Sequence, residues 1–482
     1  MALLQRNEAA RDCAAWARDG PIDASLLGKV LRRALRGGGD FADCFLEHRQ
    51  TLTVRLESGR CQGIQAGVEE GAGVRVCGTP TTSYAYTDQV TRAGLMGAAE
   101  AAGAAYGNGA GARVPADLRE HCFEPQPVSR SPLDVDLARK VALLREADEA
   151  ARAAAPEVRQ VALTYVEVIQ TVVIAGSDGS LARDHRTRVR GMVRVVAARG
   201  DSVQRAFAAP GATAGWEFFD GGRLTRTAIE TARTAQRLLE AEPAPLGRMP
   251  VVVGTDFGGV LFHEASGHGL EADAIARRAS PFVGKLGQRV ASPLVTAVDD
   301  ATVPGAWGSM GVDDEGVRAR RTVLIQDGVL QSYLYDRMGA LSAGRAPTGN
   351  GRRESYLYLP IPRMTNTFIT AGRATVEAII GDTRRGLYAR KLGSGQANPL
   401  TGEFSFAVAE GYLIEGGRVT RPVRGAMLTG SGPQALMQID AVADDLALTP
   451  GSCTKDGQRL PVGLGQPHLR IASLTVGGTE AG

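Results

Sequence analysis

The feature that most constrains the fold of this chain is an apolar run followed at once by a glycine-rich, helix-like segment, in residues 249–273. These residues read MPVVVGTDFGGVLFHEASGHGLEAD, and the apolar run 251–253 predicts a buried strand. Asp256 is placed to cap the N-terminus of the segment that follows. A strand, a turn and a helical segment are therefore expected in close succession.

The helical segment carries two histidines and a glutamate, His263, Glu264 and His268. Two imidazoles with a carboxylate beside the first are typical of metal hydrolases, in which the imidazoles bind zinc and the glutamate takes a proton from the metal-bound water. Such a cluster can arise by chance in a long chain. This chain, however, has only six histidines, and two of them fall within six residues directly after a predicted strand. We interpret the cluster as a metal site.

The spacing of the two histidines restricts the local backbone. They lie five residues apart, and in a regular α-helix five residues span roughly 140° more than a full turn, so the two rings would diverge. Two ligands that far apart cannot share one tetrahedral ion. Either the helix widens into an i→i+5 turn, which occurs often at functional sites, or it ends near Gly267.

Composition excludes several classes of function. The net charge of +3 comes from 55 basic and 52 acidic residues, which gives no electrostatic case for nucleic acid or an anionic membrane. No stretch approaches the roughly 18 apolar residues that a membrane span needs, and the N-terminus lacks the apolar core of a secretory signal. The six cysteines are scattered, which favours reduced thiols and a cytoplasmic location.

The order of the segments predicts an α+β protein of two domains. In the first half, strands are expected at 51–57, 158–174 with a break near Glu167, and 189–199, and helices at 1–35, 88–105, 136–155 and 224–240. Residues 241–250 contain three prolines and are predicted to be a linker. They separate an N-terminal domain of mixed strands and helices, residues 1–240, from a β-rich domain, residues 251–482, that carries the metal-binding helix. In the second domain, helices are expected at 375–380 and 434–443.

A catalytic zinc usually takes three protein ligands and a water molecule, so the two histidines need a third partner. Nearness in sequence favours Glu271 or Asp273. Cys453 and His468 are also candidates. Lys455 lies two residues after Cys453, and a nearby cation favours the thiolate that binds metals, although a buried and inert cysteine fits this pattern equally well.

A second polar segment, residues 347–362, reads PTGNGRRESYLYLPIP. Arg352 or Arg353 could pair with a substrate carboxylate or stabilise an oxyanion. A surface hairpin with solvated charges explains the same residues as well.

Several long motifs together resemble one known family. In the second half they are VLFHEASGHGLEAD (260–273), DDEG (313–316), PTGNGRRESY (347–356), PRMTNTF (362–368), GYLIEGGRVTRPVRGAMLTGSG (411–432) and CTKDGQRLPVGLGQP (453–467). In the first half the best matches are GAGVRV (71–76) and SDGSLARD (177–184). The sequence resembles the TldD/PmbA family of metallopeptidases, and its TldD branch in particular.

The resemblance implies a site and a mode of assembly. The family has the same five-residue histidine spacing, and its third zinc ligand is a C-terminal cysteine, which maps to Cys453. Glu264 maps to the general base. One departure is Thr454, where the family commonly has glycine. Family members act on unfolded or short peptides in a cleft enclosed between two subunits, and the TldD-like subunit usually pairs with a PmbA/TldE-like partner that lacks the metal motif.

The expected function is therefore that of a zinc-dependent peptidase for unfolded, short or modified peptides, with Glu264 acting on zinc-bound water. Exposed strand edges in a β-rich domain could bind an extended peptide as an added strand. Two alternatives stay open. The chain could be a catalytically silent peptide-binding subunit of a heteromeric complex, or a dedicated hydrolase in the maturation of a peptide-like natural product.

Overall fold

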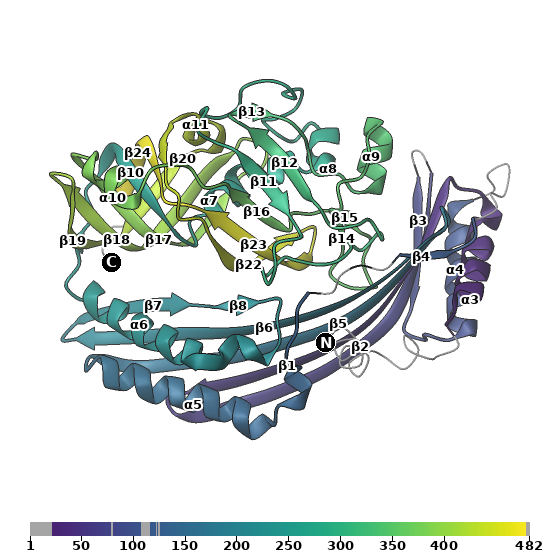
Figure 1. Cartoon of the computed structure of the whole chain (residues 1–482), viewed down its shortest axis with the longest axis horizontal. Coiled ribbons are helices and arrows are strands. Elements are labelled where there is room, and N and C mark those ends of the chain that lie inside the picture. The colour runs from purple at the N-terminus through teal and green to yellow at the C-terminus, as the bar shows by residue number, and fades with distance from the viewer. Residues whose placement is uncertain (1–21, 79–80, 108–115, 122, 124–125, 479–482) are drawn as a thin grey trace.

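The computed structural model describes residues 22–478, apart from residues 79–80, 108–115, 122 and 124–125. The described part consists of two layers, and it contains both helices and strands, which confirms the predicted α+β class (Figure 1). The N-terminal sheet and its helices form the lower layer in this view, and the C-terminal strands form the upper layer. The part of the N-terminal helix predicted before residue 22 lies outside the described residues.

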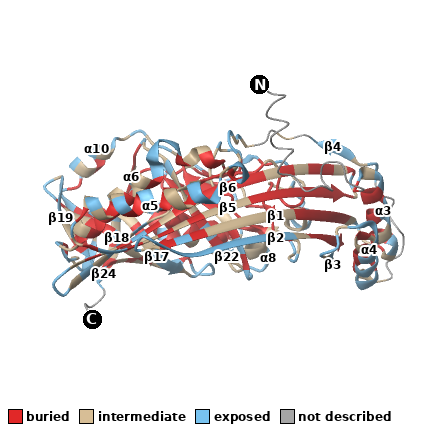
Figure 2. Cartoon of the chain, turned by 90° about the horizontal axis from the view of Figure 1, so that it is seen from below, coloured by how far each residue is buried: buried red, intermediate tan, exposed pale blue. Residues whose placement is uncertain are grey.

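Four long antiparallel strands dominate the N-terminal sheet. They are β1 (Phe41–Glu57), β2 (Arg60–Cys77), β5 (Val158–Gly176) and β6 (Ser180–Arg199). Four shorter strands complete it, namely β3 (Thr82–Thr87), β4 (Arg119–His121), β7 (Ser202–Ala208) and β8 (Gly211–Ala212). The order is β3-β2-β1-β5-β6-β4, with β7 and β8 also paired to β6. Figure 2 shows these strands from below, with the first half of β2 exposed.

The break predicted near Glu167 was wrong, because β5 runs through this residue without interruption. A charged residue in an apolar run suggests the end of a strand, but here the charge is paired. Glu167 is buried, the Lys140 ammonium lies 2.7 Å from one of its carboxylate oxygens, and the Tyr165 hydroxyl donates to the same oxygen at 2.5 Å. A buried charge with such partners does not need to end a strand.

Two pairs of helices cover the N-terminal sheet, one pair at each end. The helices are α3 (Ala24–Ala34), α4 (Arg92–Tyr106), α5 (Leu137–Ala154) and α6 (Arg223–Leu238). Each pair has its own apolar cluster against the strands. The helices predicted at 88–105, 136–155 and 224–240 are therefore present. The first begins later than predicted, because Thr91 caps it by accepting a hydrogen bond from the backbone of Gly94.

The C-terminal half forms two larger sheets and a small hairpin. The first sheet contains β9 (Glu242–Pro243), β10 (Gly247–Asp256), β17 (Arg385–Ala397), β18 (Glu403–Glu415), β19 (Arg418–Arg424), β20 (Ala426–Ser431), β21 (Ile439–Val442) and β24 (Leu469–Gly478). The second has the order β13 (Val329–Leu330), β12 (Arg321–Gln326), β11 (Ala297–Asp300), β16 (Asn366–Ile369), β23 (Gln458–Gln466) and β22 (Ala447–Lys455). The hairpin pairs β14 (Gly351–Arg352) with β15 (Ile361–Pro362).

The predicted linker, residues 241–250, contains the short strand β9 and the first residues of β10. The boundaries of the two domains stay a prediction.

The helices of the C-terminal half are short. They are α7 (Val260–Phe262), α8 (Ala272–Ala276), α9 (Arg337–Ala343), α10 (Val376–Gly381) and α11 (Gly432–Met437). The helix predicted at 375–380 corresponds to α10. The helix predicted at 434–443 was wrong in its second half, because residues 439–442 form β21 and pair with β24.

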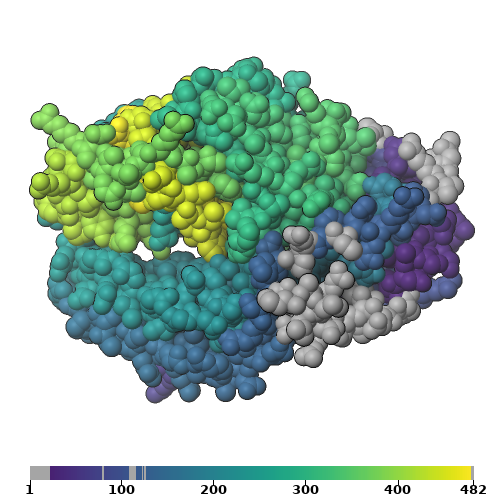
Figure 3. All heavy atoms as spheres, in the orientation of Figure 1, coloured from purple at the N-terminus to yellow at the C-terminus, as the bar shows by residue number. Residues whose placement is uncertain are grey.

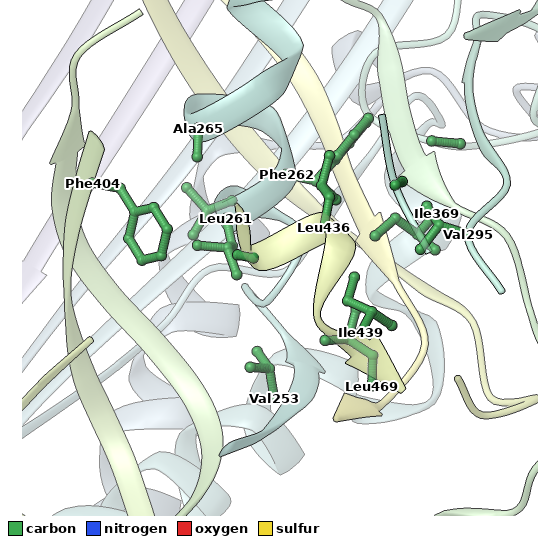
Figure 4. Close-up of a cluster of buried hydrophobic side chains, with 14 of the residues drawn as sticks. Val253, Leu261, Phe262, Ala265, Val295, Ile369, Phe404, Leu436, Ile439 and Leu469 are labelled. Carbon is green, nitrogen blue, oxygen red and sulfur yellow. The ribbon is translucent and has the colours of Figure 1, made fainter. Parts of the chain in front are cut away.

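An apolar core anchors the segment that carries the histidines. Figure 4 shows Leu261 and Phe262 of α7 beside Leu436 of α11, with Val253 of β10 nearby. All four side chains are buried. Burial of a large aliphatic or aromatic side chain contributes about 1.5–3 kcal/mol, so this core fixes α7 against the sheet. The next turn of the chain therefore starts from a rigid position.

Buried charges join the two layers. Arg186 of β6 binds Asp184 at 2.8 Å, and it also donates to Asp314 and to the carbonyl of Val312, both at 2.7 Å, in the upper layer. Elsewhere the surface is hollowed between the layers, as seen between the teal and yellow residues in Figure 3. Within the described residues, no helix is long and apolar enough to cross a membrane.

Candidate metal centre

The two histidines of the motif are joined by one π-helical turn, His263–Gly267, which follows α7 directly. The backbone N–H of His268 donates to the carbonyl of His263, five residues earlier. Of the two backbone alternatives, the structure therefore has the widened turn. A complete i→i+5 turn brings both imidazoles to the same side, and their ring centroids lie 5.1 Å apart.

The predicted cap at Asp256 was wrong. Gly259 occupies the N-cap position of α7, and Asp256 ends β10 with its carboxylate 3.0 Å from the ammonium of Lys391.

The glycines around the π-helical turn allow close packing. Gly267 has φ −56° and ψ −49°, which any residue adopts in a helix. A Cβ atom there would lie 2.4 Å from Sδ of Met364, and one on Gly259 would lie 2.4 Å from the backbone nitrogen of Gly465. At Gly259 the neighbouring atom belongs to the backbone, so space requires glycine there, whereas a Cβ atom on Gly267 would force the Met364 side chain to shift.

Four side chains converge at this turn. One donor atom from each of His263, Glu264, His268 and Cys453 lies within 4.8 Å of the others. Cys453 comes from β22, and its Sγ lies 3.2 Å from Nε2 of His268. His263 and Cys453 are 1% and 4% exposed, whereas the Glu264 side chain is 33% exposed. The carboxylate is therefore the member of the cluster that solvent reaches most easily.

The cluster fits a zinc ion by its donor set and by an unsatisfied group. Both ring nitrogens of His263 are buried and have no hydrogen-bond partner among the described residues. Leaving such atoms unpaired costs about 1–3 kcal/mol each, and a metal ion would satisfy one of them. Tetrahedral zinc with bonds of about 2.0–2.3 Å holds its ligand atoms roughly 3.5 Å apart. Imidazole and thiolate are ligands that zinc favours.

Charges in and around the cluster favour the metal-binding form of Cys453. Burial alone would raise the pKa of this thiol, but the neighbouring imidazoles of His263 and His268 lower it to about 4. Burial would likewise raise the pKa of Glu271, but His268 and Lys455 lower it to about 2. A thiolate is the form of cysteine that binds metals.

The other candidates for the third ligand occupy different places. Glu271 lies on the far side of His268, with Oε2 2.9 Å from Nδ1, and Asp273 binds Lys455 at 2.7 Å. His468 is bound to Tyr388 at 2.8 Å and to Asp445 at 2.6 Å, outside the cluster. Only Cys453 among the four joins His263 and His268.

Thr454, the departure from the family pattern, is an exposed residue of β22, where a β-branched side chain fits well.

The two arginines proposed as substrate contacts lie in the interior. Arg352 donates to the carbonyls of Met364 and Pro461, the latter at 2.8 Å, and Arg353 donates to the carbonyl of Asp314 at 3.1 Å. Each arginine is 2% exposed. The structure does not bring either guanidinium into the metal cluster, and their contacts favour a structural role.

Sequence reasoning considered Lys455 only as a cation near Cys453. The structure shows that its ammonium also binds Glu271, at 2.9 Å. The sequence suggested a turn-like context for Cys453, whereas residues 447–455 form β22, in which residues i and i+2 share one face.

Models of one protein family match three parts of this chain. Models of the PmbA/TldA metallopeptidase family match domain 1 over residues 42–105, the central domain over residues 130–239 and the C-terminal domain over residues 246–478. The four residues of the cluster all lie within the C-terminal match, namely His263, Glu264, His268 and Cys453.

Relatives and solved structures extend the comparison to nearly the whole chain. A metalloprotease TldD homolog of Haemophilus influenzae is 40% identical over 454 residues, which cover 92% of this chain and 93% of that protein. A metalloprotease of Methanothermobacter thermautotrophicus is 35% identical, over 95% of this chain and 100% of that protein. The crystal structure of TldE from Thermococcus kodakarensis has the same fold, with a TM-score of 0.77 at 19% identity, covering 94% of this chain and 100% of that chain. This chain therefore belongs to the TldD/PmbA family of metallopeptidases.

Proposed function

We propose that this protein is a zinc-dependent peptidase, in which His263, His268 and Cys453 hold the ion and Glu264 is the general base. One observation carries the proposal. Four side chains from two segments about 185 residues apart converge, while both nitrogens of the buried His263 lack a hydrogen-bond partner within the described chain. An intact cluster of this kind also argues against a catalytically silent subunit.

Bound zinc would supply Lewis-acid chemistry, polarising a carbonyl group and lowering the pKa of a water molecule. The protein residue that moves protons is Glu264. Its side chain is one-third exposed, and Oε2 lies 3.7 Å from Nε2 of His268, so the carboxylate faces the cluster and solvent at once. Glu264 takes a proton from the attacking water and returns it to the nitrogen of the leaving amine.

The substrates we propose are unfolded, short or modified peptides. β22, which carries Cys453, lies at one end of its sheet and pairs only with β23 among the described strands. The outer edge of such a strand can bind an extended peptide through those main-chain groups that are not already bonded, as the carbonyl of Pro450 is to Arg190. Recognition of this kind selects for extended conformation and makes few demands on side chains.

The proposed assembly is a heterodimer with a PmbA/TldE-like subunit, located in the cytoplasm. The likeness of this fold to TldE supports a partner of the same architecture. Cys44, Cys61, Cys77 and Cys453 are free thiols in the described part of the chain, which agrees with a reducing compartment.

The test of this proposal is Glu264→Gln. Removal of a general base typically costs about 10²–10⁴-fold in rate, so the variant should bind zinc like the parent and cleave an unfolded polypeptide at least about 100-fold more slowly. Glu377→Gln, at an exposed position of α10, is the matched control and should cleave normally. Both are assayed alone and with a PmbA/TldE-like subunit. Parent-like cleavage by a zinc-loaded Glu264→Gln protein would overturn the proposal.

A further inference from the structure

Lys455 connects the strand of the cysteine to the segment of the histidines. It lies two residues after Cys453 on β22, so both side chains project from the same face of the strand. Its ammonium donates to Glu271 at 2.9 Å, to Asp273 at 2.7 Å and to the carbonyl of Pro362 at 3.3 Å. An ammonium has three donors, and each of them has an acceptor here.

Glu271 completes the connection from the other side. It is 0% exposed, and its Oε2 lies 2.9 Å from Nδ1 of His268 as well as 2.9 Å from the Lys455 ammonium. Its other oxygen accepts from the backbone N–H of Met364 at 3.3 Å. Polar contacts therefore run from His268 through Glu271 to Lys455, and the backbone of β22 joins Lys455 to Cys453.

We propose that Glu271 and Lys455 are positioning residues of the metal centre, and we name them the Glu271–Lys455 clamp. Glu271 accepts the Nδ1–H of His268, which leaves the lone pair of Nε2 directed at Cys453 and the ion. Lys455 fixes the position of β22 relative to the segment of the histidines, so that Cys453 can reach that ion. This proposal rests on the metal centre of the proposed function, and it adds two residues that act through His268 and Cys453.

An ordinary buried ion pair would stabilise the fold without affecting the ion, and Asp273 separates the two roles. It accepts from the same ammonium, but among the described residues it makes no hydrogen bond to a member of the cluster. Asp273→Asn therefore weakens the ion pair of Lys455 with residue 273, while the contact between Glu271 and His268 stays in place. It is the matched control for Glu271→Gln and Lys455→Met.

The experiment measures zinc affinity of the full chain by competition with a chelator, together with urea unfolding of the metal-free protein. Loss of a group that orients a metal ligand typically weakens binding about 10–100-fold, and we expect this for Glu271→Gln and Lys455→Met, with Asp273→Asn within about threefold of the parent. Lys455→Arg keeps the charge and should recover part of the affinity. In cobalt-substituted protein, the thiolate-to-cobalt absorption band should weaken or shift in Lys455→Met and persist in Asp273→Asn.

If Glu271→Gln and Lys455→Met both bind zinc as tightly as the parent, the proposed clamp is overturned. This holds even if the metal-free variants are less stable than the parent. Glu271→Gln is nearly isosteric and decides the question if Lys455→Met does not fold. If the parent binds zinc but cleaves no peptide, the proposed peptidase function is overturned. The clamp is then judged by the zinc affinities of its variants alone. A parent that binds no zinc overturns the metal centre and the clamp together.

Discussion

The backbone N–H of His268 donates to the carbonyl oxygen of His263 and closes a π-helical turn between the two imidazoles. This single bond explains how histidines five residues apart reach one site. The turn fits because Gly267 passes directly against Met364, whose backbone N–H in turn binds Glu271. The geometry of the cluster therefore depends on packing as well as on the ligands.

The first prediction concerns Gly267→Ala. The backbone there is helical, so helix propensity alone would favour alanine by about 1 kcal/mol. The new methyl group would meet Met364, and overpacking costs about 1–3 kcal/mol, so the variant should be less stable and bind zinc more weakly. Urea unfolding of the metal-free protein measures the change. In a Met364→Ala background the same substitution should become neutral or stabilising, and an equal loss in both backgrounds would contradict this explanation.

The second prediction concerns the contact between the layers at Asp314. Burial would raise the pKa of Asp314, but Arg186 and the backbone N–H of Arg353 lower it below its usual 3.8. A carboxyl with a lowered pKa stabilises the fold fully above its unfolded value and loses that contribution as pH falls through the folded value. Asp314→Asn should therefore cost about 3–5 kcal/mol at neutral pH, and less as the pH falls below 3.8. Unfolding in urea across a pH series measures this difference. If the free energies of unfolding of the parent and the variant ran parallel with pH, the result would contradict the prediction.

The third prediction separates structural from substrate-binding roles for Arg352. Arg352→Lys keeps the charge but cannot reach both the Met364 and Pro461 carbonyls with a planar fork. Loss of one hydrogen bond from a charged group costs about 1.5–3 kcal/mol, so stability should fall while KM for peptides stays within about twofold. A large rise in KM with unchanged stability would instead support the substrate contact that the sequence suggested.

The fourth prediction concerns metal removal. A ligand at 100 times its Kd stabilises the native state by about 2.7 kcal/mol, so zinc should raise the thermal midpoint of the metal-free parent. Cys453→Ser should show a smaller gain, because it lacks the thiolate. Cys61→Ser, at an exposed position, should respond like the parent. Equal gains in all three proteins would show that Cys453 does not hold the ion.

The local part of the site was accessible from sequence. The apolar run 251–253, the histidine spacing and the resemblance together predicted a strand and a metal cluster, and they left a widened turn as one of two possible backbones, because these features depend on neighbouring residues. The approach of Cys453 was not available from spacing, since it depends on the placement of the β22–β23 hairpin. Nearness in sequence pointed to Glu271, which contacts the opposite nitrogen of the same histidine.

The two errors in the predicted secondary structure also arise from contacts between distant residues. The predicted break in β5 failed because Glu167 has a buried cation partner 27 residues earlier, in Lys140. The predicted helix at 434–443 failed because tertiary pairing with β24 takes residues 439–442 into a sheet. In both cases a contact between distant residues overrides the local pattern.

The most direct test of the metal centre is the zinc content of purified protein per chain, measured for the parent and for His263→Ala, His268→Ala and Cys453→Ala. The parent should contain one zinc ion per chain, and each variant should lose most of it after brief exposure to a weak chelator. A parent without stoichiometric zinc, or variants that retain it as firmly as the parent, would contradict the assignment of these three ligands.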